Sequence, residues 1–304
     1  AAKQVGIRLH LSRGSMDLGE SKGGLPPDHV VEDREAILSS TESIIAKHHD
    51  AEMIHVVVAP CSPFSVTTEL MVDSAELARK HGVRLHTHLC ETLEEQEYCL
   101  ANFGRRPVEM LDEWGWVDDD VWLAHGIHID HDEMERLGGA GTGIAHCPSS
   151  NARLAAGMCP VTDLLEAGCP IGLGVDGVAS NEIGGLFPEL RQALFTARQR
   201  EMKPDALMPH EVVEMATKGG ARCLGLEDLG TFEVGQKADI AIWPGGDLGD
   251  IPDPLTGLVM GPDRRVRHLF VGGSQIIDET ELKNVDMNSA HLELTNHAKR
   301  LFDI

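Results

Sequence analysis

Four side chains have the types and spacing expected of a hydrolytic metal site: His88, Glu91, His125 and Asp176. Imidazole nitrogens bind zinc or iron, and a metal ion lowers the pKa of a bound water toward about 7. A nearby carboxylate that does not bind the metal can act as a general acid or base. The structural alternative is a buried His88 beside a solvated Glu91, and the spacing alone leaves both open.

Two of these positions strengthen the hydrolytic interpretation. His125 ends the apolar run 122–125, and Asp176 ends the run 171–176. A carboxylate there is costly to bury unless it is paired or bound to a metal. An ionised Asp176 beside a bound water could take its proton. His128 follows on the next loop, where we expect a hydrogen bond that shapes the loop, with metal binding as the alternative.

The elements that would position these residues alternate along the chain. Strands are predicted at 5–11, 53–61, 83–89, 121–127, 142–148 and 170–176, and helices at 35–47, 68–81, 94–103, 108–114, 132–137 and 161–167. Repeated strand–helix units of this kind predict a parallel sheet. The ionisable residues gather at the carboxyl ends of the strands. That end is the catalytic face of a (β/α)8 barrel and the ligand edge of a doubly wound sheet.

The pattern changes after Asp176. Two helices are predicted at 186–200 and 209–224. Antiparallel strands are predicted within 230–243 and 265–277, with turns at 234–237 and 272–273, a Pro/Gly/Asp-rich segment at 244–257 and a final helix at 289–301. We therefore expect a barrel portion at 1–228, a small β-rich module at 229–288 and a C-terminal helix at 289–304.

Composition limits the classes of partner. The 304 residues include 49 acidic and 26 basic side chains, which gives a formal net charge of −23. Phosphates repel such a chain, so nucleic acid and anionic membranes are not expected as partners. Seven scattered cysteines without CxxC spacing favour a reducing compartment, and we expect the cytoplasm. A neutral or cationic small molecule remains as the expected substrate.

Several segments together resemble the amidohydrolase superfamily, in its branch of purine, cytosine and triazine deaminases and chlorohydrolases. They are HLCE at 88–91, LAH at 123–125, AHCPSSN at 145–151, GVDGVASN at 174–181 and GTFEVGQKAD at 230–239. Segments 13–16, 19–28 and 59–65 are most similar to the 8-oxoguanine deaminases. The resemblance implies a (β/α)8 TIM-type barrel, of which this chain carries strands 3–8, and a small β-sandwich domain.

The resemblance also implies roles for the polar residues. His88 would be a metal ligand, and His125 and Asp176 would ligate the metal or lie beside it. Glu91 would shuttle protons between water and substrate, while Asp176 accepts the water proton. One divalent metal is implied, zinc or alternatively iron.

Three more residues are candidates for substrate binding, each with a structural alternative. Cys61 would read the substrate or be a small buried thiol. Arg13 would bind a purine carbonyl or form a salt bridge within its loop. His146 would touch the substrate or, together with Asn151, brace the loop that follows its strand.

The function implied is metal-dependent hydrolytic deamination of a purine-type heterocycle, with 8-oxoguanine converted to urate and ammonia by attack of a metal-bound hydroxide. Guanine, cytosine and triazine aminohydrolases or chlorohydrolases are the near alternatives. We also expect a homo-oligomer.

The family begins its metal site with an HxH pair on strand 1, and this sequence has neither strand 1 nor strand 2. We therefore expect the sequence to continue upstream of Ala1, with an HxH pair there. If that pair is truly absent, a non-catalytic binding protein is the alternative.

Overall fold

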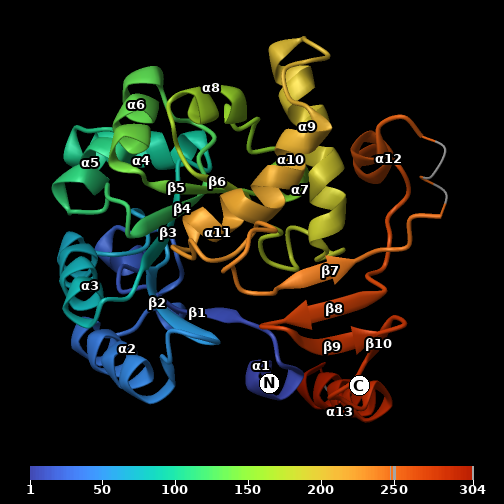
Figure 1. Ribbon diagram of the computed structural model, residues 1–304. Helices are drawn as coiled ribbons and strands as arrows, with labels where there is room; N and C mark the ends of the chain where they lie inside the picture. The colour runs from blue at the N-terminus through green and yellow to red at the C-terminus, as the bar shows by residue number, and fades with distance from the viewer. Residues whose placement is uncertain (247, 249–250, 303–304) are drawn as a thin grey trace.

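The computed structural model describes residues 1–246, 248 and 251–302. One parallel sheet runs through its centre, with six strands adjacent in chain order (Figure 1). The strands are β1 (Leu9–Ser15), β2 (Ile54–Pro60), β3 (Leu85–Leu89), β4 (Val121–His125), β5 (Gly143–His146) and β6 (Ile171–Leu173). This order is the one expected for the last six strands of a TIM-type barrel.

The helices between these strands have clear sequence signals at their ends. They are α2 (Arg34–His48), α3 (Thr68–His81), α4 (Leu93–Phe103), α5 (Pro107–Glu113), α6 (His131–Ala140) and α8 (Val161–Glu166). Thr67 and Thr92 cap the starts of α3 and α4 by accepting backbone N–H groups, and Gly82 and Gly104 end these helices in the left-handed conformation. These helices therefore begin and end within about two residues of the predicted positions, except that α6 extends to Ala140 beyond the predicted end at 137.

The prediction for the first strand was wrong in its position. Residues Ala2–Val5 form a short helix, α1, that ends at Gly6, where φ is +87°. β1 begins at Leu9 and pairs with β2 as far as Ser15, which lies opposite Pro60. The second half of the strand, Ser12–Ser15, is polar or glycine, so it lacks the apolar pattern that marks the other strands.

The helical region 209–224 is continuous but irregular. α10 (Pro209–Glu214) passes through a π-helical turn, Met215–Gly219, into α11 (Gly220–Cys223). The helix packs very closely on β6, because a Cβ atom on Gly219 would lie 2.0 Å from the carbonyl oxygen of Ile171. Only glycine permits that approach. α9 (Leu186–Glu201) precedes this region, close to its predicted range.

The C-terminal part forms a second, antiparallel sheet in the order β10-β9-β8-β7 (Figure 1). Its strands are β7 (Ile240–Ile242), β8 (His268–Val271), β9 (Ser274–Asp278) and β10 (Glu281–Leu282). The turn at Gly272–Gly273 is confirmed, but 230–243 was predicted too long, because only its last part is a strand. The final helix, α13, spans Met287–Phe302 (Figure 1).

Two short helices were not predicted. α7 (Pro148–Arg153) follows β5 directly, and α12 (Pro254–Met260) lies in the Pro/Gly/Asp-rich segment. Asp247, Gly249 and Asp250 of that segment lie outside the described residues. None of the described helices is long and apolar enough to cross a bilayer.

Candidate metal-dependent active site

Three potential metal ligands meet at the carboxyl edge of the parallel sheet. His88 is near the end of β3, His125 ends β4, and Asp176 follows β6. One donor atom from each lies within 4.8 Å of the others. The two imidazole rings stack with their centroids 5.5 Å apart. The pairing of β3 with β4 produces this proximity, because Leu89 lies opposite His125 in the register.

The backbone of the residue after β2 fixes the His88 ring. His88 Nδ1 donates to the carbonyl oxygen of Cys61 at 2.7 Å, and the Thr87 hydroxyl donates to the same oxygen at 3.0 Å. Because this hydrogen bond holds Nδ1, Nε2 is the ring nitrogen that could bind a metal. Burial alone would lower the pKa of His88, but hydrogen bonding to Cys61 and the charge of its thiolate raise it to about 9.

His125 is oriented by an amide from the following helix. Its Nδ1 lies 3.0 Å from Oδ1 of Asn151 on α7, and the ring is 1% exposed. Its Nε2 lies 3.6 Å from Oε2 of Glu91. The sequence interpretation assigned Asn151 a role in its own loop and missed this contact. The only sequence signal was its place a few residues after the end of the strand that carries His146.

Asp176 is held by two hydroxyls. Ser150 Oγ donates to Asp176 Oδ2 at 2.5 Å, and Ser180 Oγ donates to the same atom at 2.9 Å. Burial raises the pKa of Asp176, but these two hydroxyls, the Gly177 N–H and the charge of His125 together lower it below the ordinary value. The carboxyl group is therefore ionised at neutral pH.

The loop that carries Glu91 rests on a buried carboxyl group of α4. Glu95 is 1% exposed, and its two oxygens accept the backbone N–H groups of Cys90 at 2.9 Å and of Glu91 at 3.0 Å. Burial raises the pKa of Glu95 to about 7, against the lowering effect of those two N–H groups. Glu95 was not singled out from the sequence, where it reads as one acidic residue among several on a helix.

Three non-glycine residues at this edge have left-handed backbones. The φ angles are +53° at Cys90, +75° at His125 and +61° at Asp176. Such conformations cost on the order of 1–3 kcal/mol each and persist where the surroundings enforce them. Two of the three are candidate metal ligands, and the third adjoins Glu91. Three of the eight described non-glycine residues with positive φ thus lie where these side chains converge.

The three candidate substrate-binding residues lie in different surroundings. Cys61 follows β2, with its thiol beside His88 and Ser65; burial raises its pKa, but the hydrogen bond to His88 makes the net shift downward. Arg13 donates both terminal nitrogens to Glu32, each at 2.8 Å, so the salt bridge expected as its alternative is formed.

His146 is more enclosed than either of these. It is 1% exposed, and both of its ring nitrogens lack a hydrogen-bond partner within the described part of the chain. Burial and then the charge of His125 lower its pKa to about 3. The ring is therefore neutral. His128, for comparison, hydrogen-bonds the carbonyl oxygen of Ala156 at 2.9 Å, as expected for a residue that shapes its loop.

The donor set of the site fits a divalent metal. Imidazole nitrogens and a carboxylate oxygen are ligands that zinc binds in catalytic sites, where further positions stay open for water or substrate. His88, His125 and Asp176 could therefore hold a zinc ion.

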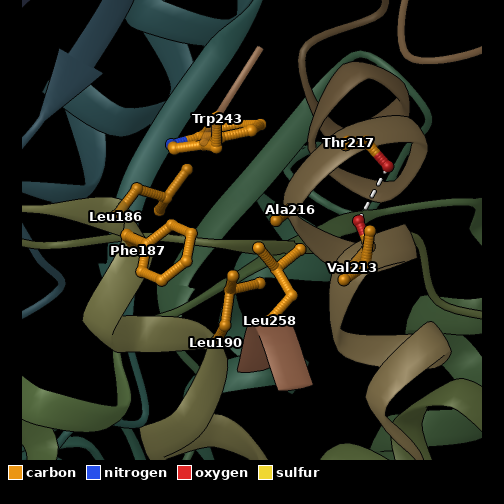
Figure 2. A pocket seen from close by; sticks show the side chains of 8 residues that line it. All are labelled: Leu186, Phe187, Leu190, Val213, Ala216, Thr217, Trp243 and Leu258. Atoms are coloured by element: carbon orange, nitrogen blue, oxygen red, sulfur yellow. Dashed lines mark hydrogen bonds between the residues drawn. The ribbon is translucent and has the colours of Figure 1, made fainter. Parts of the chain in front are cut away.

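A separate apolar pocket is lined by residues of α9, α10, the π-helical turn and α12 and by Trp243 after β7, and Figure 2 shows these side chains. Phe187 and Trp243 lie with their rings 6.0 Å apart, and Thr217 donates to the carbonyl of Val213 at 2.7 Å instead of pointing a free hydroxyl into the hollow. The volume is about 150 Å³. Its lining includes no acid, base or metal ligand, so hydrolytic chemistry belongs to the polar site.

The sequence is similar to that of known hydrolases. The sequence profile of the Amidohydrolase family matches residues 1–276. An 8-oxoguanine deaminase from Pseudomonas aeruginosa is 46% identical over 290 residues, which cover 94% of this chain and 64% of that protein. An isoxanthopterin deaminase from an unknown prokaryotic organism is 34% identical and is matched over 99% of this chain and 66% of its own length. This chain thus spans about two thirds of the relatives it matches.

Solved structures agree with the sequence comparison. Atrazine chlorohydrolase from Arthrobacter aurescens, complexed with zinc, superposes with a TM-score of 0.92 at 34% identity, over 97% of this chain and 67% of that one. An adenosine deaminase from Xanthomonas campestris with bound zinc gives 0.90 at 26% identity, over 99% of this chain and 68% of that one. Both structures contain zinc.

Proposed function

This chain belongs to the amidohydrolase family, and from that membership we propose that it is a zinc-dependent hydrolytic deaminase of an aminated purine-type heterocycle. The observation that carries the proposal is the convergence of His88, His125 and Asp176, with Glu91 3.6 Å from the His125 ring. A metal site with an adjacent carboxylate can activate water for hydrolysis of a C–N bond and supply protons to the leaving group.

Each side chain has a task in the proposed reaction. Zinc would lower the pKa of a water and polarise the carbon to be attacked. Asp176, ionised and fixed by Ser150 and Ser180, accepts a proton from the attacking water at its carboxylate. Glu91 carries one proton of the water to the ring nitrogen and then carries the second, held by Asp176, to the departing amine, which leaves as ammonia while the ring carbon becomes a carbonyl. His125 lies beside Glu91, and its Nε2 faces that carboxylate.

The substrate we propose is 8-oxoguanine, attacked at C2 to give urate and ammonia. The 46% identity to the Pseudomonas 8-oxoguanine deaminase over nearly the whole chain supports this choice. Cys61, beside His88, and Arg13, on β1, are the proposed substrate-reading residues. Both terminal nitrogens of Arg13 donate to Glu32. To bind the substrate, Arg13 must either release one of these hydrogen bonds or contact the substrate while still paired with Glu32.

Triazines are the second candidate substrates, because the atrazine chlorohydrolase structure superposes with a TM-score of 0.92. The proposal further includes a cytoplasmic homo-oligomer that acts on a free small molecule, without nucleic acid or membrane. Seven free cysteines support a reducing compartment, and the net charge of −23 supports the absence of nucleic acid and anionic membrane as partners.

A panel of heterocycles tests the substrate. The zinc-loaded protein is incubated with 8-oxoguanine, guanine, cytosine, isoxanthopterin and atrazine, and ammonia or chloride release is measured with product identification by mass. We expect the highest kcat/KM with 8-oxoguanine and formation of urate. A preference for a triazine would replace the substrate but keep the chemistry, whereas no release from any compound would reject deamination.

A further inference from the structure

A small cavity lies near the amino ends of β1, β2 and β3, at the edge of the sheet opposite the candidate metal site. Its volume is about 40 Å³. Three imidazoles and one guanidinium line it, from His10, His49, His55 and Arg84, together with residues 56–57 and 82–83. None of these residues has a role in the proposed deamination.

Several polar atoms at this cavity are buried without a partner. Both ring nitrogens of His10, Nε2 of His55 and Nε of Arg84 have no hydrogen bond within the described residues. Buried polar atoms of proteins are nearly always paired with protein, water or a ligand. Four orphaned atoms around one hollow therefore indicate that something polar occupies it.

The Arg84 guanidinium is fixed in place, but its charge is not compensated by an ion pair. Its Nη2 donates to the carbonyl oxygens of Asp119 at 2.5 Å and of Cys223 at 3.1 Å. No salt bridge to Arg84 occurs among the residues that the structure describes, and no acidic side chain lines the cavity. Burial lowers the pKa of Arg84, and the charges of Asp120 and Asp119 oppose that shift from outside the cavity lining.

The imidazoles add donors with a defined geometry. The rings of His10 and His55 stack in parallel, with centroids 4.5 Å apart and 9° between their planes. Burial, followed by the charges of His55, Arg84 and His49, lowers the pKa of His10 to about 4. His49 Nδ1 accepts the N–H of Val56 at 3.1 Å, so its neutral ring carries the hydrogen on Nε2.

We propose that this cavity is a binding site for a small inorganic anion of halide size, held by Arg84 Nε and by N–H groups of His10 and His55. An anion accepts hydrogen bonds from all three groups and neutralises the half-buried guanidinium. Water would satisfy the hydrogen bonds but leave the charge uncompensated. The volume admits an ion about as large as a few water molecules and excludes nucleotide-sized ligands.

Thermal unfolding with matched salts tests the site. The midpoint Tm is measured in sodium bromide and in sodium gluconate at equal ionic strength, since gluconate is too large for the cavity. We expect a saturable rise of about 3 °C in bromide relative to gluconate, a shift typical of a modest ligand on a domain of this size. Arg84→Gln should abolish the rise. The matched control Arg136→Gln, an exposed arginine paired with Asp112, should retain it.

A second variant and a direct observation complete the test. If Arg84→Gln does not fold, His10→Phe provides the test. This variant keeps a ring stacked on His55 but removes both nitrogens, and it should weaken bromide binding at least about fivefold. A crystal soaked in bromide should show one anomalous peak between His10, His55 and Arg84. An equal Tm in the two salts, the same rise in a folded cavity variant, or no peak would each overturn the proposal, and none of these results bears on deamination.

Discussion

Nδ1 of His125 lies 3.0 Å from Oδ1 of Asn151, and this hydrogen bond determines which ring nitrogen of His125 is directed to the site. An amide oxygen only accepts, so the ring proton is on Nδ1. Nε2 therefore faces Glu91 and the potential metal ligands His88 and Asp176. The end of β4 is thereby coupled to α7, one of the two short helices that the sequence did not predict.

Replacing Asn151 by alanine should weaken metal binding without removing a ligand. Loss of a hydrogen bond that orients a ligating histidine typically costs about 10–100-fold in metal affinity. Competition for zinc with a chromophoric chelator measures it. Asn102→Ala, on the exposed surface of α4, is the matched control and should bind zinc as the wild type does. Equal affinities of the Asn151 variant and the wild type would show that the contact does not orient His125.

Glu95 should give the protein a specific pH dependence of stability. Its pKa is raised to about 7 from an ordinary 4.5 by burial, so between these values the folded state binds a proton that the unfolded state has lost. The free energy of unfolding should therefore fall as pH rises through this window, by on the order of 1 kcal/mol per pH unit.

Urea unfolding of wild type and Glu95→Gln between about pH 5 and 7 isolates this contribution, because glutamine does not titrate. The difference between the two proteins should shift in favour of the variant as pH rises. Glu97→Gln, an exposed neighbour on α4, should follow the wild-type slope. Parallel curves for wild type and Glu95→Gln would mean that Glu95 is ionised throughout.

Arg106 should matter for stability because it neutralises a buried acid. It donates to both oxygens of Glu133, at 3.0 and 2.8 Å, and to the carbonyl of His128, which is on the loop after His125. Arg106→Ala leaves Glu133 buried without its cation, which costs about 3–5 kcal/mol. Chemical denaturation measures this loss. Arg136→Ala removes an exposed pair and should cost about 1 kcal/mol or less, so similar losses in the two variants would contradict the distinction.

Most of the barrel portion could be predicted because its signals are local. β2 is a run of apolar residues buried on both faces, and α3 has a threonine cap and a terminal glycine that define its limits. β1 was displaced because its carboxyl half, with Arg13 and Gly14, has no apolar pattern and is defined by pairing with β2. α12 was missed because proline and glycine, which usually break helices, here start it and lie within it.

The candidate site likewise contains residues that could be predicted from the sequence and residues that could not. His88, His125 and Asp176 could be found because each lies at the end of a predicted strand, and parallel strands bring their carboxyl ends together. Glu95 and Asn151 could not be found, since their importance comes from hydrogen bonds to Glu91 and His125 that exist only once the chain is folded. Supporting residues of this kind have no pattern of their own in a single sequence.

The most direct test of the central claim separates proton transfer from metal binding at Glu91. Ammonia release from 8-oxoguanine and bound zinc are measured for wild type and Glu91→Gln, with Glu97→Gln as control. We expect one zinc in all three proteins, full activity in the control, and a kcat lower by about 10²–10⁴-fold in Glu91→Gln. Near-normal ammonia release by the zinc-loaded Glu91 variant would contradict the account.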